Sequence, residues 1–105
     1  MAQFDVHRNI GPQKRDLPFV VVVQSRRFDS SGRRVVVPLT PAAGISFAEG
    51  RLNPTFEVED RLVVLHPLLI VSIALDQLGP KVGSLATEGN RIIAALDLVV
   101  SRAWD

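Results

Sequence analysis

The sequence predicts an α+β fold, in which a strongly bent antiparallel sheet or a small, partly open barrel is followed by one helix. Two observations carry this prediction. Short apolar segments separated by turn residues occupy most of the chain, and helical periodicity is confined to its end. The chain has 105 residues, of which 47% are hydrophobic, so we expect a single domain over residues 1–105 with one core.

The start of the chain predicts a strand with one buried face. Apolar and polar residues alternate there, which is the period of a half-buried strand. The inward positions would be Phe4, Val6 and Arg8, and the outward positions Gln3, Asp5 and His7. A polar loop with a Gly-Pro breaker follows at residues 11–16.

The next segment predicts a hairpin of two buried strands. Residues 17–24 contain four consecutive valines, which favour a central strand. The Asp-Ser-Ser-Gly sequence at residues 29–32 is a strong turn signal. Residues 33–39 then return as the partner strand, and residues 40–44 interrupt the pattern.

A second hairpin is predicted after the turn at residues 52–54. Its strands are residues 55–58 and 61–65, with Glu59 and Asp60 at the tip. Residues 67–75 are ambiguous, and fit a strand followed by a helical turn that ends near residues 79–80.

The last segment predicts a helix over residues 87–102. Its apolar positions follow helical spacing, and Ser84 or Thr87 can cap its start, where Glu88 suits the helix dipole. The apolar positions are Ile92, Leu96, Val99, Val100 and Ala103. One helix covers one side of the sheet, so a second copy of the chain can cover the remaining apolar face and we expect a homodimer.

Composition excludes several functional classes. The chain has no cysteine, so it has no disulfide framework and no Cys-ligated metal site. Twelve basic residues against eleven acidic ones leave a net charge of +1, which argues against a dedicated nucleic-acid binder. Residues 1–16 are polar and do not resemble a signal peptide, and the most apolar stretch, residues 62–75, is shorter than the ~20 residues of a membrane span. We therefore expect a soluble cytoplasmic protein.

The sequence offers no converging catalytic groups. Neither His7 nor His66 has metal-ligand spacing, so both are interpreted as ordinary strand residues, and we expect no metal or cofactor. The acidic cluster of Glu57, Glu59 and Asp60 can supply an acid–base pair, but a solvated hairpin tip explains it better. These patterns favour a binding module over an enzyme.

Two further features have alternative interpretations. Four arginines flank one turn and can either clamp an anion or form the charged ends of neighbouring strands, and the second explanation is favoured. They are Arg26, Arg27, Arg33 and Arg34. Trp104 either packs back on the body or anchors a partner, since tryptophan is enriched in binding hot spots.

Four segments of the chain, in order, resemble the CcdB family of toxins from plasmid-addiction systems. They are Gln3-Phe4-Asp5-Val6, the hairpin VVVQSRRFDSSGRRVVVPL at residues 21–39, the LNP at residues 52–54 and NRIIAALDLVV at residues 90–100. The resemblance implies an SH3-like, partly open barrel with a C-terminal helix, and a homodimer. It implies a non-catalytic toxin that binds the A subunit of DNA gyrase and traps the cleaved DNA complex.

The resemblance also implies the gyrase-binding residues. Gln3, Phe4 and Ser25 match the family pattern, whereas His7 replaces an aromatic residue, Arg27 an aliphatic one and Asp97 an asparagine. The family's C-terminal Trp-Gly-Ile aligns with Ser101, Arg102 and Ala103, and with a short insertion Trp104 takes the aromatic role.

A CcdA-like antitoxin is the second implied partner. Its disordered acidic segment is expected on the basic loop after the first strand, through Arg8, Asn9, Lys14 and Arg15. In the family, toxin and antitoxin together repress their own operon, and DNA is contacted chiefly by the antitoxin.

Two alternatives stay open. The chain can be a CcdB-like dimer with a weak or altered target. It can instead be a MazF-like endoribonuclease toxin of the same barrel architecture, with Arg33, Arg34 and Glu57 over an RNA groove.

Overall fold

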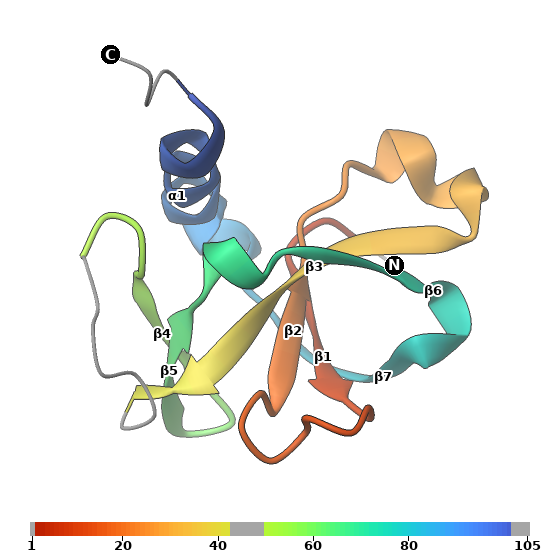
Figure 1. Ribbon diagram of the computed structural model, residues 1–105, viewed down its shortest axis with the longest axis horizontal. Coiled ribbons are helices and arrows are strands. Elements are labelled where there is room, and N and C mark those ends of the chain that lie inside the picture. Colours follow the sequence, from red (N-terminus) through yellow and green to blue (C-terminus); the bar gives the residue numbers. More distant parts are fainter. Residues whose placement is uncertain (1, 43–49, 102–105) are drawn as a thin grey trace.

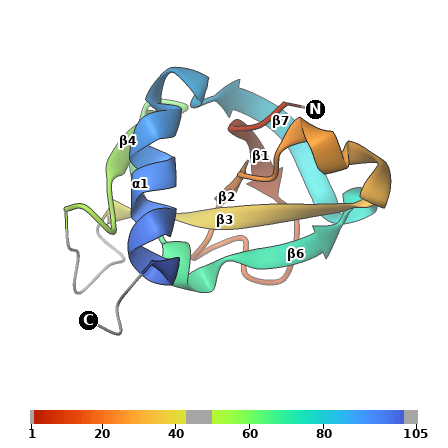
Figure 2. The same cartoon turned by 90° about the horizontal axis from the view of Figure 1, so that it is seen from above.

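A computed structural model of the protein describes residues 2–42 and 50–101. Within them, one antiparallel sheet curls into a half-barrel, and a single α-helix lies on one face of it (Figures 1 and 2). The strand order is β4-β5-β3-β2-β1-β7, and β6 also pairs with β3. The elements are β1 (Asp5–Asn9), β2 (Phe19–Val22), β3 (Arg33–Pro41), β4 (Thr55–Val58), β5 (Arg61–Leu65), β6 (Val71–Ala74), β7 (Leu78–Ser84) and α1 (Gly89–Val100). The predicted α+β fold is confirmed.

Strand β3 organises the sheet because it has two successive neighbours on one edge. Its first residues pair with β6 and its last residues pair with β5. Pro38 lies between these two stretches, and its carbonyl accepts a hydrogen bond from the His66 N–H at 3.0 Å. The N–H that proline lacks would point to the same edge, so the ladder loses one hydrogen bond there. The chain between β5 and β6 leaves the sheet as the short 3₁₀ helix η3 (Pro67–Leu69).

The two faces of β2 and β3 bury separate apolar clusters. Phe19, Val21 and Val37 belong to the main core, which α1 covers with Ile92 and Ala95. The alternating valines belong to a smaller cluster on the other face, as the period of two requires. That cluster consists of Val20, Val22 and Val36, with Ile73 and Leu78 packed against it.

The predicted hairpins are confirmed. Strands β2 and β3 pair with each other, and β4 and β5 have the predicted bounds, with left-handed backbone at Glu59 and Asp60 (φ 50° and 62°). The turn before β3 is longer than predicted, because residues 26–31 form the 3₁₀ helix η1 (Arg26–Ser31) before Gly32 reverses the chain at φ 78°.

The predicted faces of the first strand are right for its apolar residues, which belong to the main core or pack against it, and wrong for polar ones. Asp5 and His7 are buried, whereas Arg8 is exposed. The cause is β7, which pairs with the second edge of β1 and makes it an interior strand. Asp5 accepts a hydrogen bond from the Ala2 N–H and lies 3.4 Å from the Lys81 ammonium, while His7 Nδ1 bonds the Gly79 carbonyl at 2.9 Å.

The C-terminal helix is shorter than predicted. Residues 86–88 form a 3₁₀ turn, so α1 begins at Gly89 and not at residue 87, and it ends at Val100. Ile92 is buried as predicted, but Val100 is 80% exposed. The expected Ser84 cap bonds the Ala86 N–H, one turn before α1.

Residues 67–75 form η3 and then β6. The helical turn after β6, η4 (Leu75–Gln77), leads into β7, which includes residues 79–80.

Substitution of Gly79 tests whether β7 approaches β1 as closely as the structure shows. A Cβ at this position would clash with the Arg8 carbonyl oxygen and lie 2.8 Å from Ile10 Cγ2. Gly79→Ala should therefore lower the free energy of unfolding by about 1–3 kcal/mol, as overpacking does. The measurement is chemical denaturation at one fixed protein concentration.

Gly83 supplies the matched control on the same strand. A Cβ there meets nothing within 4 Å, so Gly83→Ala should change the unfolding free energy by less than about 0.5 kcal/mol. Equal effects of the two substitutions would show that β7 does not approach β1 as described.

Candidate functional site

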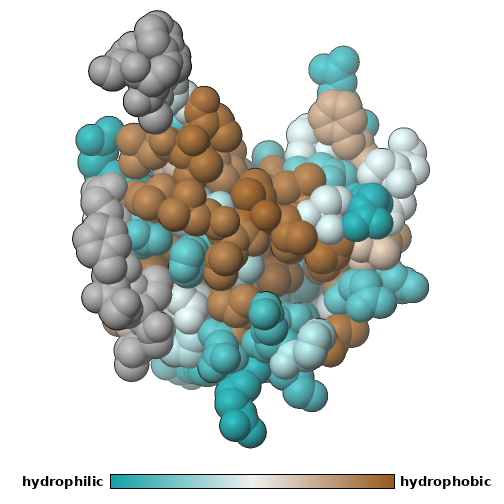
Figure 3. Space-filling model, in the orientation of Figure 1, coloured by the Kyte–Doolittle hydropathy of each residue, from teal (hydrophilic) through white to brown (hydrophobic). Residues whose placement is uncertain are grey.

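Within the residues that the structure describes, four consecutive exposed apolar residues lead from η3 into β6. We call Leu68, Leu69, Ile70 and Val71 the apolar face; their exposed fractions are 65%, 43%, 42% and 46%. Its η3 part packs against α1. Figure 3 shows an apolar surface running between two projections of the molecule, of which one is the C-terminal half of α1 and the other is η1. Contiguous exposed apolar surface of this kind is typical of a protein–protein interface.

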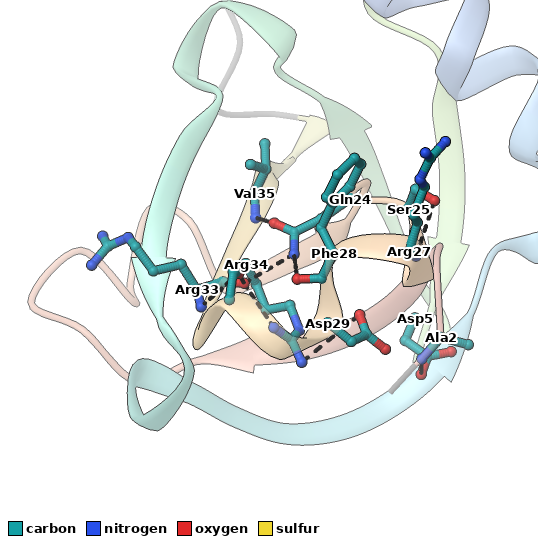
Figure 4. A network of polar contacts seen from close by, with 11 residues as sticks. Ala2, Asp5, Gln24, Ser25, Arg27, Phe28, Asp29, Arg33, Arg34 and Val35 are labelled. Carbon is teal, nitrogen blue, oxygen red and sulfur yellow. Dashed lines mark hydrogen bonds and ion pairs between the residues drawn. The ribbon is translucent and has the colours of Figure 1, made fainter.

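The η1 projection is held rigidly by Gln24 (Figure 4). The Gln24 amide nitrogen donates to the carbonyls of Phe28 and Arg33 at 3.1 and 3.0 Å, and its oxygen accepts from the Val35 N–H at 2.9 Å. Ser25 begins η1, and its hydroxyl accepts from the Arg27 N–H at 3.2 Å. Phe28 is therefore presented on a fixed support, with 55% of its surface exposed.

The four arginines around η1 do not form one clamp. Arg33 donates to the hydroxyl and the carbonyl of Ser72, both at 2.8 Å, and so fastens β3 to β6. Arg34 is buried, with Asp29 3.8 Å away and the Arg33 carbonyl at 2.7 Å. Arg26 and Arg27 are exposed on η1 itself. Arg33 and Arg34 thus match the favoured interpretation of charged strand ends, whereas Arg26 and Arg27 lie on η1 and not on a strand.

The expected gyrase-binding residues near the N-terminus are partly buried. The Gln3 amide donates to the Val23 carbonyl at 2.9 Å. Phe4 has φ 71° and packs against the core, with its ring beside Gly89 at the start of α1. His7 is only 6% exposed, so its side chain does not face solvent.

The other expected gyrase-binding residues lie on the two projections. Arg27 is exposed in η1 and Ser25 is exposed directly before it, while Asp97 and Ser101 are exposed at the C-terminal end of α1. Asp97 and Ser101 line a pocket of about 500 Å³, which Arg91 also lines. Arg102, Ala103 and Trp104 lie outside the described residues. The structure thus places Ser25 and Arg27 at one projection and Asp97 and Ser101 at the other, and not in one cluster.

The expected antitoxin loop borders a second pocket. Arg8, Asn9 and Gln13 contribute to its wall, while Lys14 and Arg15 are exposed on the same loop. The pocket has a volume of about 230 Å³, and its other lining is mainly apolar. Sequence reasoning named the basic loop but missed the pocket, because its apolar side chains come from strands far apart in the chain.

Asn9 has a structural role in this loop. Its amide nitrogen donates to the Leu17 carbonyl at 2.7 Å, and its oxygen accepts from the Gly11 N–H at 2.9 Å. Because both ends of the amide are bonded within the loop, Asn9 fixes the loop's shape. Sequence analysis assigned it only to antitoxin contact.

The acidic cluster forms the predicted hairpin tip. Glu59 makes an ion pair with Arg8 at 2.9 Å, and the Glu59 and Asp60 side chains are exposed. Glu57 lies on β4, two strands away from Arg33 and Arg34 on β3. No group of three or more His, Asp or Glu residues capable of holding a metal occurs in residues 2–42 and 50–101. In the same part of the chain, no helix has the length and apolar character needed to span a bilayer.

Comparisons with known proteins agree with this architecture. A solved structure described as an endoribonuclease in complex with its cognate antitoxin, from Mycobacterial species, superposes with a TM-score of 0.75. The two chains are 19% identical, and the match covers 100% of this chain and 99% of the other. No curated protein matches this sequence.

The family comparison extends over almost the whole chain. The model of the family described as CcdB protein matches residues 3–101, which include the apolar face, both projections and the basic loop. The resemblance seen in the sequence is thereby confirmed. The chain belongs to the CcdB family and is a toxin of a toxin–antitoxin system.

Proposed function

We propose that this toxin acts as a dimer that binds the A subunit of DNA gyrase and traps the cleaved DNA complex, and that a CcdA-like antitoxin neutralises it. The supporting observation is the family match across residues 3–101, which includes the two projections that carry the expected gyrase-binding residues. Toxin and antitoxin together would repress their operon in the cytoplasm, with the antitoxin contacting DNA.

The exposure of the apolar face supports the dimer. Four consecutive large apolar residues are each more than 40% exposed in the single chain. Soluble monomers rarely leave such a stretch uncovered, and a two-fold axis allows one self-complementary patch to cover itself. We place the dimer contact at this face and call it the dimer seam. The two projections of each copy would then lie on either side of the seam.

The chemistry of two pockets, the one beside the basic loop and the one at the end of α1, favours occupation of a target over catalysis. The pocket beside the basic loop is lined by apolar groups, amides and Arg8, without a carboxylate or an imidazole to act as a base. The pocket at the end of α1 has Asp97, but Arg91 faces the same space. The Arg91 guanidinium already bonds Glu88 and the Thr55 carbonyl. An RNA-cleaving toxin remains the alternative, because the similar solved structure is described as an endoribonuclease.

The gyrase proposal predicts that the purified protein converts supercoiled plasmid to linear DNA in the presence of gyrase and ATP. Trp104→Ala should weaken this effect at least tenfold, because an aromatic anchor contributes on the order of 2–4 kcal/mol to a complex. The measurement is the toxin concentration that gives half-maximal linear product.

Leu62→Ala serves as the control, since Leu62 is an exposed apolar residue on β5, away from both projections. It should retain the activity of the unsubstituted protein. Absence of linear DNA with the unsubstituted protein would contradict the gyrase proposal. If the toxin alone also cleaved RNA, this result would support the endoribonuclease alternative.

The dimer proposal predicts that Leu69→Asp produces monomers. A carboxylate in the centre of an apolar seam would be desolvated without a partner, so association should weaken by at least tenfold. Size-exclusion chromatography across a dilution series measures this change. Leu62→Asp introduces the same charge at another exposed leucine and should leave the dimer intact. If Leu69→Asp also elutes as a dimer, the contact lies elsewhere.

A further inference from the structure

The pocket beside the basic loop is built on the smaller apolar cluster of the sheet. Val20 and Val36 form part of its lining, and both belong to the cluster on the face that α1 does not cover. Val71 and Ile73 of β6 line it as well, and Val71 is also the last residue of the apolar face. The pocket therefore opens directly beside the surface assigned to the dimer.

The volume of the pocket limits which chemical groups can occupy it. Its volume is about 230 Å³. Pockets for small-molecule ligands and cofactors usually measure roughly 300–1,000 Å³. This one suits a single large apolar side chain, and apolar pockets that receive one anchor residue are typical of protein interfaces.

The wall of the pocket is already ordered without a partner. Asn9 holds the loop through its two amide hydrogen bonds, and the Asp16 and Leu17 N–H groups both bond the Gln13 carbonyl, at 3.1 and 2.8 Å. An occupant entering such a site does not have to order the loop, which favours tight binding.

The rim of the pocket carries positive charge that is available to an incoming carboxylate. Arg8, at the end of β1, lines the pocket and is exposed. Lys14 and Arg15 are exposed on the adjoining loop, where Asp16 is the single acidic residue. The Arg8 guanidinium already holds both carboxylate oxygens of Glu59 at 2.9 Å, so its geometry accepts a carboxylate. Both side chains of this pair are at least 40% exposed, and exposed pairs contribute little to stability, so another carboxylate can replace Glu59.

We propose that this pocket receives one large aliphatic or aromatic side chain from an acidic segment of the antitoxin, and that a neighbouring carboxylate of the same segment takes the place of Glu59 on Arg8. This inference rests on the proposed antitoxin partnership and adds the anchoring chemistry to it. Burial of the apolar side chain slows dissociation, while the basic rim accelerates association in a salt-dependent way.

The first experiment blocks the pocket. The probe is the full-length antitoxin encoded by the reading frame adjacent to the toxin gene, and the measurement is its Kd for the full-length toxin. Gln77 is exposed and lines the pocket, so Gln77→Trp places a bulky ring at its mouth and should weaken binding at least tenfold. Leu75→Trp adds the same ring to the same short helix, at an exposed position that does not line the pocket, and should bind within twofold of the unsubstituted toxin.

The second experiment separates the rim charge from the internal ion pair. Arg8→Gln and Glu59→Gln both break the Arg8–Glu59 contact. Arg8→Gln should slow association threefold or more at low salt and flatten its salt dependence. Glu59→Gln releases Arg8 and should bind the antitoxin as tightly as the unsubstituted toxin, or more tightly.

Two results would overturn the inference alone. They are Gln77→Trp binding within twofold of the unsubstituted toxin, and equal losses from Arg8→Gln and Glu59→Gln. A failure of the unsubstituted toxin to bind the antitoxin at all would instead overturn the partnership itself. Circular dichroism of each variant confirms that a loss of binding is not a loss of folding.

Discussion

The interruption of β3 at Pro38 is the constraint on which the surface of this toxin depends. A central strand normally pairs along its whole length, but proline has no N–H to donate. The edge changes partner from β5 to β6 at this residue, and the chain leaves the sheet after His66, as η3. This detour exposes the apolar face and positions η3 against α1. The same geometry turns β6 so that Val71 and Ile73 line the pocket beside the basic loop.

One small sheet can serve several partners because its polar side chains are used mainly to fix shape. Gln24 supports the η1 projection, Arg33 fastens β3 to β6, and Asn9 holds the basic loop. Apolar groups and exposed charges are then left for recognition. Under the proposed function, such a toxin would act by occupying a surface of its target. The adjacency of the pocket to the proposed dimer seam would let an antitoxin segment engage the toxin beside that seam.

Elements that depend mainly on local sequence were predicted correctly from local patterns. The second hairpin was predicted with its final bounds, because β4 alternates between exposed and buried residues, β5 is a short apolar run and the turn between them is short. The burial of Asp5 and His7 on β1 was not predictable, since it depends on the pairing with β7, more than seventy residues later. The start of α1 was misplaced because residues 86–88 form a tighter turn that has the same local signals.

The candidate sites were predictable only in part for the same reason. The resemblance pointed to Ser25, Asp97 and the basic loop from their order in the chain. The burial of His7 and the internal bonding of Asn9 depend on tertiary contacts. So does the pocket, whose lining joins β2, β3 and β6. The periodicity of a sequence does not predict which strands will be neighbours in the sheet.

Sedimentation equilibrium of the unsubstituted toxin at low micromolar concentration tests the central claim most directly, namely that the apolar face is covered by a second copy. The chain has a mass of 11.5 kDa. The account predicts a particle with twice the mass of one chain throughout this range. A particle with the mass of a single chain at every concentration would contradict it.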